Sequence, residues 1–241
     1  MPAGRAKVGV ITGSGMEELF GSSTERLVKT DYGVVKVYAC TSGGKGFVVI
    51  PRHGREHSVP PHRVNFKANV QAMKVIGVRD VIATSAVGSI SKKVGVGELG
   101  LLDQFIDLSK RHLTFFEKTP THVDMTYPYD AALREMLSGA ARSLGISVKP
   151  GLVYVCVDGP RYETAAEIRM FGLLGGDVVG MTGAPEAILS RELGLRYASV
   201  VVATNWAAGI QEKVSHDEVL RVMEKARPRL RSLLELAIAG R

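Results

Sequence analysis

The chain has 241 residues, of which 45% are apolar and 23% are charged, and its formal net charge is +7. This composition is typical of a globular protein with a sizeable core and excludes disordered, collagen-like and membrane-spanning chains. Lys and Arg are spread along the sequence, without a basic stripe or an alternation of aromatic and basic residues. We therefore expect the charge to serve solubility or an anionic small substrate, and we expect no nucleic-acid partner.

The cysteines and the N-terminal sequence bear on the cellular compartment. Cys40 and Cys156 have no CxxC spacing, which excludes a disulfide framework and a cysteine zinc site. The apolar stretch at residues 8–11 is cut short by Gly13 and Gly15, well below the length of a signal peptide. We expect a cytoplasmic protein with no membrane association.

Short β-branched runs alternate with amphipathic stretches along the chain. Apolar runs of four to eight residues bounded by glycine indicate strands that are buried on both faces. The predicted strands are residues 8–11, 47–50, 80–83, 152–157, 177–180 and 198–203. The predicted helices are residues 65–76, 129–144, 165–174, 185–193 and 216–239. This alternation is typical of an α/β fold, and we expect one domain over residues 1–241.

Two segments carry finer local signals. Residues 34–38 and 47–50 flank the glycine-rich residues 41–46, which predicts a β-hairpin. The C-terminal helix has a predicted N-cap at Ser215, with Glu218 at the spacing of a capping box.

Residues 53–57 match the HxxEH pattern of zinc peptidases. That pattern binds metal only on a helix, where residues four apart share a face. Pro51 precedes the motif, Gly54 lies inside it and Pro60 follows closely, so a loop is expected. We therefore predict no metal site.

Polar residues follow several predicted strands, at the edge where open α/β sheets bind ligands. The first groups are residues 12–15, Arg52 with His53, and residues 84–88. A guanidinium, an imidazole, hydroxyls and backbone amides together suit an oxyanion or a phosphate. Each group also has an ordinary explanation, since a glycine-rich turn is often only a turn and Arg52 could form a surface ion pair.

A second set of polar residues comes later, at residues 159–164, 180–183 and 204–206. It offers an aromatic ring, a carboxylate and a carboxamide that could converge on a planar heterocycle. The alternatives are that Glu163 compensates the charge of a helix N-terminus and that Asn205 is a turn residue.

These motifs, in this order, resemble those of the purine nucleoside phosphorylase and methylthioadenosine phosphorylase family from about Val8 to about Val222. The resemblance is carried by residues 13–15, 52–54 with His57, 64–69, 84–89, 159–164, 180–182, 185–187 and 204–205. It implies a single-domain α/β phosphorylase fold with a mixed central β-sheet flanked by helices. It also implies that inorganic phosphate is a co-substrate and that no metal or organic cofactor is needed.

The resemblance further implies roles for individual residues. Phosphate is expected to bind among Ser14, Arg52, His53, Ser85, the Ala86 amide and Thr182. The ribose is expected at the Met181 backbone, and the base beside Tyr162, Glu163 and Asn205. The implied catalytic residues are Asn205, Glu163 and His53.

The implied reaction is phosphorolysis, in which phosphate displaces the purine from C1′ through an oxocarbenium-like transition state. Asn205 would stabilise the departing base by donating a hydrogen bond to N7. Ionised Glu163 suits a 6-oxopurine, whose N1–H is a donor, whereas N1 of adenine is an acceptor. Methylthioadenosine-specific relatives resemble one another in carrying a small hydroxyl residue in place of Glu163 and aspartates in place of Asn205 and Ala207. The expected substrates are therefore inosine and guanosine.

The 5′ end of the nucleoside leaves two interpretations open. His216 resembles a histidine that binds the ribose 5′-hydroxyl in the 6-oxopurine enzymes, but it could also face solvent in the first turn of its helix. The chain also resembles methylthioinosine phosphorylases, so the alternative function is cleavage of 5′-methylthioadenosine or 5′-methylthioinosine. His122 resembles a residue that reaches into a neighbouring subunit's pocket, which implies a homotrimer or a dimer of trimers.

Overall fold

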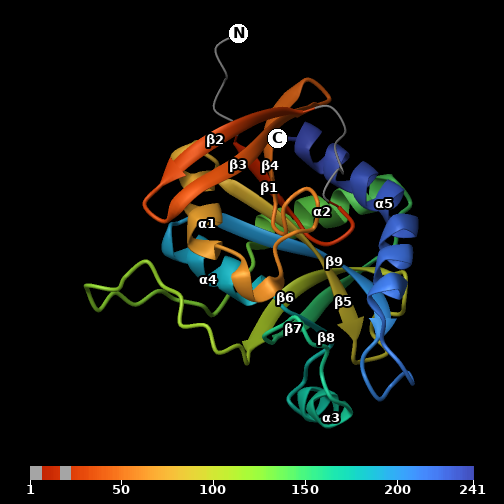
Figure 1. The fold of residues 1–241 in the computed structure, drawn as a ribbon. Helices are drawn as coiled ribbons and strands as arrows, with labels where there is room; N and C mark the ends of the chain where they lie inside the picture. The colour runs from red at the N-terminus through yellow and green to blue at the C-terminus, as the bar shows by residue number, and fades with distance from the viewer. Residues whose placement is uncertain (1–6, 17–22) are drawn as a thin grey trace.

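The computed structural model describes residues 7–16 and 23–241, which form a mixed β-sheet with helices on both faces (Figure 1). The strands are β1 (Val8–Thr12), β2 (Thr24–Thr30), β3 (Gly33–Ser42), β4 (Lys45–Pro51), β5 (Asp80–Ser89), β6 (Leu99–Asp107), β7 (Val148–Cys156), β8 (Val178–Gly180) and β9 (Arg196–Trp206). The helices are α1 (Phe66–Val75), α2 (Ala131–Ser143), α3 (Ala165–Leu173), α4 (Gly183–Glu192) and α5 (His216–Ala239), with a short 3-10 helix at Pro61–Arg63.

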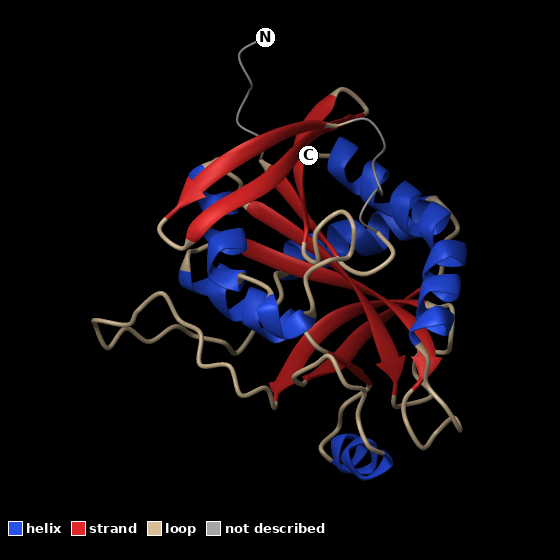
Figure 2. Cartoon of the chain, viewed as in Figure 1, coloured by secondary structure: helices blue, strands red, loops and turns tan. Residues whose placement is uncertain are grey.

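The strand order is β2-β3-β4-β1-β5-β8-β7-β6-β9, and β9 also pairs with β5. Strands β5, β8, β7, β6 and β9 therefore close on themselves as a small barrel, and β1 to β4 extend the sheet from β5 (Figure 2). Strand β1 is parallel to β4 and β5, whereas β5–β8 and β6–β9 are antiparallel. The mixed sheet confirms the expected fold class; its closure into a barrel was not predicted.

Two apolar cores lie on opposite faces of the sheet. Val10 packs in the core that α2 and α5 cover, and the next residue, Ile11, packs in the core that α1 and α4 cover. This alternation explains why β1 reads as a continuous apolar run. Ser215 is the N-cap of α5, as predicted, and its side chain accepts a hydrogen bond from the Glu218 amide. The Glu218 carboxylate accepts from Gln211 Nε2 at 2.8 Å rather than from the Ser215 amide, so only half of the predicted capping box is formed.

The local predictions for residues 31–57 are confirmed. Strands β3 and β4 form an antiparallel hairpin around Gly43 and Gly44, both of which have positive φ, at +54° and +75°. Residues 53–57 form an irregular loop directly after β4. Strands β2 and β6 were missed, because β2 is a mostly exposed edge strand and β6 pairs with β7 through two register shifts.

One expectation about the site segments is wrong. Residues 84–88 lie inside β5, and residues 204–206 lie inside β9, rather than after the ends of these strands. The reason is that β5 and β9 continue past the end of β1, whose residue Ile11 pairs with Ala83. Ser85 and Ala86 therefore still lie beyond the carboxyl end of a neighbouring strand.

The segment from residue 108 to 130, between β6 and α2, has no regular secondary structure, and a loop of it projects from the body of the molecule (Figure 1). Its ends pack on the body, where Arg111 donates to the Met181 carbonyl and Tyr129 is buried. In the described part of the chain, no helix combines the length and apolar character needed to cross a bilayer.

Candidate active site

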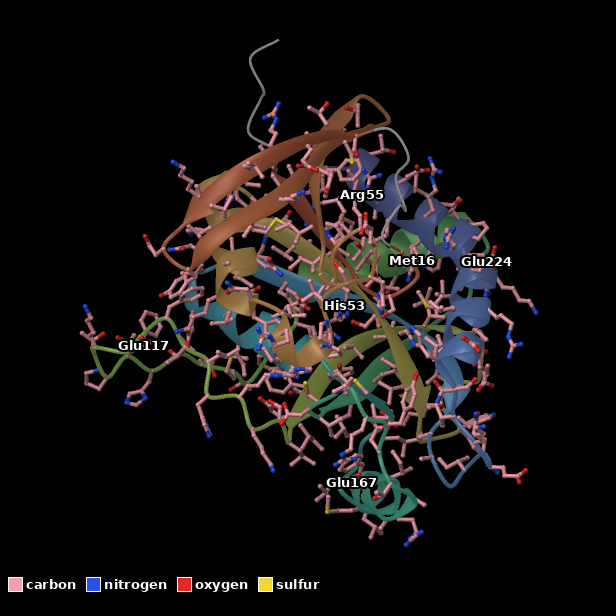
Figure 3. All side chains as sticks on the ribbon, viewed as in Figure 1. Met16, His53, Arg55, Glu117, Glu167 and Glu224 are labelled. Atoms are coloured by element: carbon pink, nitrogen blue, oxygen red, sulfur yellow. The ribbon has the colours of Figure 1, made fainter. Side chains whose placement is uncertain are left out.

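A cavity of about 440 Å³ lies where β1 and β4 end and β5 and β9 continue. Its lining includes the predicted residues Ser14, Arg52, His53, Ser85, Ala86, Tyr162, Glu163, Met181, Thr182, Asn205 and His216. The structure thus brings together every residue predicted for phosphate and substrate except His122. His122 is exposed on the segment 108–130, whose Glu117 lies at the periphery of the molecule while His53 lies near its middle (Figure 3).

Arg52 is buried at one end of the cavity and forms an ion pair with Glu186, which is also buried. Its Nε lies 2.5 Å from Glu186 Oε1, its Nη2 lies 2.8 Å from Oε2, and its Nη1 donates to the Thr84 carbonyl at 3.1 Å. Burial alone would lower the pKa of Arg52, but the Glu186 carboxylate outweighs it and raises that pKa. Three of the five guanidinium N–H groups have these partners among the described residues, so two remain for an anion.

His53 follows Arg52 and is 5% exposed. Its Nδ1 lies 2.8 Å from the Val59 carbonyl oxygen. Because a carbonyl only accepts, Nδ1 carries a proton, and Nε2 is the basic nitrogen of the neutral ring. The ring is thereby held in one orientation beside Arg52.

The turn after β1 and strand β5 meet at the same end of the cavity. The Gly13 amide donates to Thr84 Oγ1 at 3.1 Å. A Cβ at Gly13 would lie 2.7 Å from the Thr84 carbonyl oxygen and 2.9 Å from an Arg52 nitrogen, so only glycine fits there. Ser85 Oγ is buried and has no hydrogen-bond partner among the described residues. A buried hydroxyl of this kind suits a ligand oxygen.

Tyr162, Glu163 and Asn205 line the same cavity, and Asn205 pairs with Gly88, three residues beyond Ser85 along β5. Exclusion from water raises the pKa of Glu163 above its ordinary value. The Asn205 Nδ2 donates to the Trp206 carbonyl at 2.9 Å, and its Oδ1 lies 2.9 Å from the Thr204 hydroxyl. These contacts orient the carboxamide and leave the second N–H of Nδ2 to donate to a ligand.

A row of three imidazole rings lines one wall of the cavity. The His57 ring lies 5.0 Å from that of His53 and 5.4 Å from that of His216, measured between ring centroids. His216, in the first turn of α5, therefore lines the cavity rather than facing only solvent. His57 had no predicted role, although its place in the motif at residues 53–57 was a signal.

Sequence reasoning also missed several residues of the cavity wall. They are Ser58, Pro60, Pro61, Val179 and Val219. Among the described residues, no group of three or more His, Cys, Asp or Glu side chains is placed to hold a metal ion. The cavity combines anion-binding groups with a carboxylate and a carboxamide, which suits a phosphate beside a planar polar ring.

The chain matches the model of the Phosphorylase superfamily over residues 7–239. It is 44% identical to the 6-oxopurine nucleoside phosphorylase of Pyrococcus furiosus, over 96% of this chain and 92% of that protein. It is 46% identical to the probable S-methyl-5'-thioinosine phosphorylase of Methanopyrus kandleri, over 96% of this chain and 91% of that protein.

Among solved structures, the chain is similar to methylthioadenosine phosphorylase from Schistosoma mansoni in complex with adenine. The TM-score is 0.90 at 33% identity, over 98% of this chain and 91% of that one. These matches confirm the resemblance and the fold that the sequence motifs predicted. The chain belongs to the phosphorylase superfamily.

Proposed function

We propose that the protein is a purine nucleoside phosphorylase that cleaves 6-oxopurine nucleosides, inosine and guanosine, to the free base and ribose 1-phosphate. The observation that carries this proposal is that Glu163 and Asn205 line the same cavity as Arg52, His53 and Ser85. A carboxylate acceptor and a carboxamide donor match the N1–H and N7 of a 6-oxopurine. The name of the Pyrococcus furiosus relative supports the same substrate class.

In this mechanism a phosphate oxygen forms a bond to C1′ as the bond from C1′ to N9 breaks. Phosphate is held by Arg52, His53, Ser14, Ser85, the Ala86 amide and Thr182. The negative phosphate stabilises the cationic sugar, and the remaining Asn205 N–H stabilises the charge that develops on the departing purine at N7. Inorganic phosphate is the co-substrate, and the proposal requires no metal or organic cofactor.

The second candidate function is the same reaction on 5′-methylthio nucleosides. The Methanopyrus kandleri relative supports it, and so does apolar Val219, which lines the cavity close to His216 in α5. The two candidates make opposite predictions for the ratio of kcat/KM between inosine and 5′-methylthioinosine. Measuring kcat/KM for inosine, 5′-methylthioinosine and 5′-methylthioadenosine in one buffer separates them. A preference for inosine supports the first, and a preference for either methylthio substrate supports the second.

We also infer that the protein acts in the cytoplasm as a homotrimer or a dimer of trimers. The support for the oligomer is His122, which is exposed on the irregular segment 108–130. In an oligomer this segment can reach a neighbouring subunit's cavity, as the family resemblance implies. Sedimentation equilibrium would give three or six times the chain mass if this is correct, and the mass of one chain would contradict it.

A further inference from the structure

Helix α4 begins beside the phosphate end of the cavity, and its own N-cap side chain does not cap it. Thr182 is the N-cap residue, but its side chain makes no capping hydrogen bond. An N-cap side chain ordinarily accepts from the amide two or three residues later. Here the residue three positions on is Pro185, which has no N–H.

Strand β7 supplies the missing cap from outside the helix. The Tyr154 hydroxyl oxygen accepts hydrogen bonds from the Thr182 amide and the Gly183 amide, each at 3.2 Å. Tyr154 thereby satisfies two amides at the start of α4, which would otherwise have no partner inside the helix.

Two glycines allow the Tyr154 ring to come this close. A Cβ at Gly180 would lie 2.6 Å from the Tyr154 hydroxyl oxygen, and a Cβ at Gly183 would lie 3.0 Å from a carbon of the ring. The backbone of the turn at residues 180–183 therefore packs directly against the Tyr154 ring. This same turn carries Met181 and Thr182, which line the cavity where ribose and phosphate are expected.

We propose that Tyr154 is a positioning residue for phosphate: by capping α4 it holds the turn at residues 180–183 and leaves the Thr182 hydroxyl for the ligand. This inference rests on the proposed phosphorylase function. Tyr154 does not itself line the cavity, so it acts through Thr182 rather than by touching the substrate. Its hydroxyl stays protonated and neutral, because burial raises the pKa of Tyr154 well above its ordinary value.

The test compares Tyr154→Phe with Tyr129→Phe. Both tyrosines are fully buried, but the Tyr129 hydroxyl has no hydrogen-bond partner among the described residues, which makes it a matched control. For Tyr154→Phe we expect KM for phosphate to rise about fivefold to tenfold, from the loss of two hydrogen bonds at the helix start. We expect KM for the nucleoside to rise less than KM for phosphate, because the ribose meets this turn only at Met181 and the residues facing the base are untouched. The rise in Tm caused by phosphate should shrink in the same variant.

Gly183→Ala gives a second, independent perturbation, because its Cβ presses on the Tyr154 ring; the same rise in KM for phosphate is expected. The inference is overturned if Tyr154→Phe leaves KM for phosphate unchanged, or if Tyr129→Phe raises it equally. A fall in kcat with no change in either KM would also overturn it. The Tm measurement needs only phosphate binding. If the wild-type protein cleaves no nucleoside, the proposed function fails while the effect of Tyr154 on phosphate binding is still measured.

Discussion

The Arg52 guanidinium and the Glu186 carboxylate face each other through two hydrogen bonds, at 2.5 and 2.8 Å, and their side chains are 1% and 0% exposed. Tyr197 donates a third hydrogen bond to Glu186, at 3.0 Å. The charge of Arg52 is therefore already balanced inside the protein. Arg52 can orient phosphate without leaving an unpaired buried cation when the cavity holds no anion.

Glu186→Gln should destabilise the fold by about 3–5 kcal/mol, because it leaves the buried Arg52 charge without a counter-ion. Phosphate can then serve as the counter-ion, so the rise in Tm on adding phosphate should be larger in the variant than in the wild type. Differential scanning calorimetry with and without phosphate measures both effects. The control is Glu235→Gln, which breaks a partly exposed pair with Arg231 and should change stability little. An equal phosphate shift in Glu186→Gln and the wild type would contradict this account.

Asn205→Asp should shift base preference toward 6-aminopurines, because a carboxylate accepts from an exocyclic amino group and cannot donate to a purine acceptor. A mismatch of this kind costs about 1–3 kcal/mol, so the ratio of kcat/KM for inosine to adenosine should fall by about tenfold or more. Asn65→Asp is the matched control, since Asn65 caps α1 outside the cavity. Unchanged base preference in Asn205→Asp would show that Asn205 does not contact the base.

The pH dependence of kcat/KM for inosine should reflect the protonation of Glu163. Exclusion from water raises the pKa of Glu163, so its carboxylate becomes protonated at a higher pH than an ordinary glutamate. As the pH falls through that pKa, the acceptor for N1–H becomes a donor, and kcat/KM for inosine should decline. The decline should begin at a higher pH than an ordinary glutamate would give.

Glu163→Gln removes the titrating group and keeps its shape. The decline of kcat/KM for inosine at low pH should then become weaker, because only the remaining titratable groups contribute to it. A profile of unchanged shape in Glu163→Gln would assign the acid limb to another residue.

His216→Leu tests whether His216 determines the preference for a 5′-hydroxyl over a 5′-methylthio group. Replacing the imidazole with an apolar side chain removes a hydrogen-bond partner of the 5′-hydroxyl and favours a methylthio group. The ratio of kcat/KM for 5′-methylthioinosine to inosine should rise by about tenfold. His112→Leu is the control, because His112 is exposed and outside the cavity lining. The same ratio in His216→Leu and the wild type would mean that His216 does not contact the 5′ group.

The predicted residues of the cavity could be found because each lies in a short motif of the family that the sequence resembles, such as Arg52-His53 after β4. Their partners could not. Glu186 is 134 residues from Arg52, and only the folded structure brings the two together. The same holds for Tyr154. Its sequence context predicts only a core residue of a buried strand, whereas in the structure its hydroxyl accepts hydrogen bonds from the amides of Thr182 and Gly183.

The missed strand β6 has a related cause. Its pairing with β7 shifts register between Gly100 and Leu102 and again between Leu102 and Gln104, so its apolar residues do not alternate as in a regular strand. Its place is set by closure of the barrel against β9, which is a long-range contact that no local pattern encodes.

Incubation of the purified protein with inosine, in the presence and absence of inorganic phosphate, tests the central claim most directly. The account predicts that hypoxanthine and ribose 1-phosphate appear in equal amounts and only when phosphate is present. Release of hypoxanthine with free ribose in phosphate-free buffer would contradict it, and so would the absence of cleavage of every purine nucleoside tested.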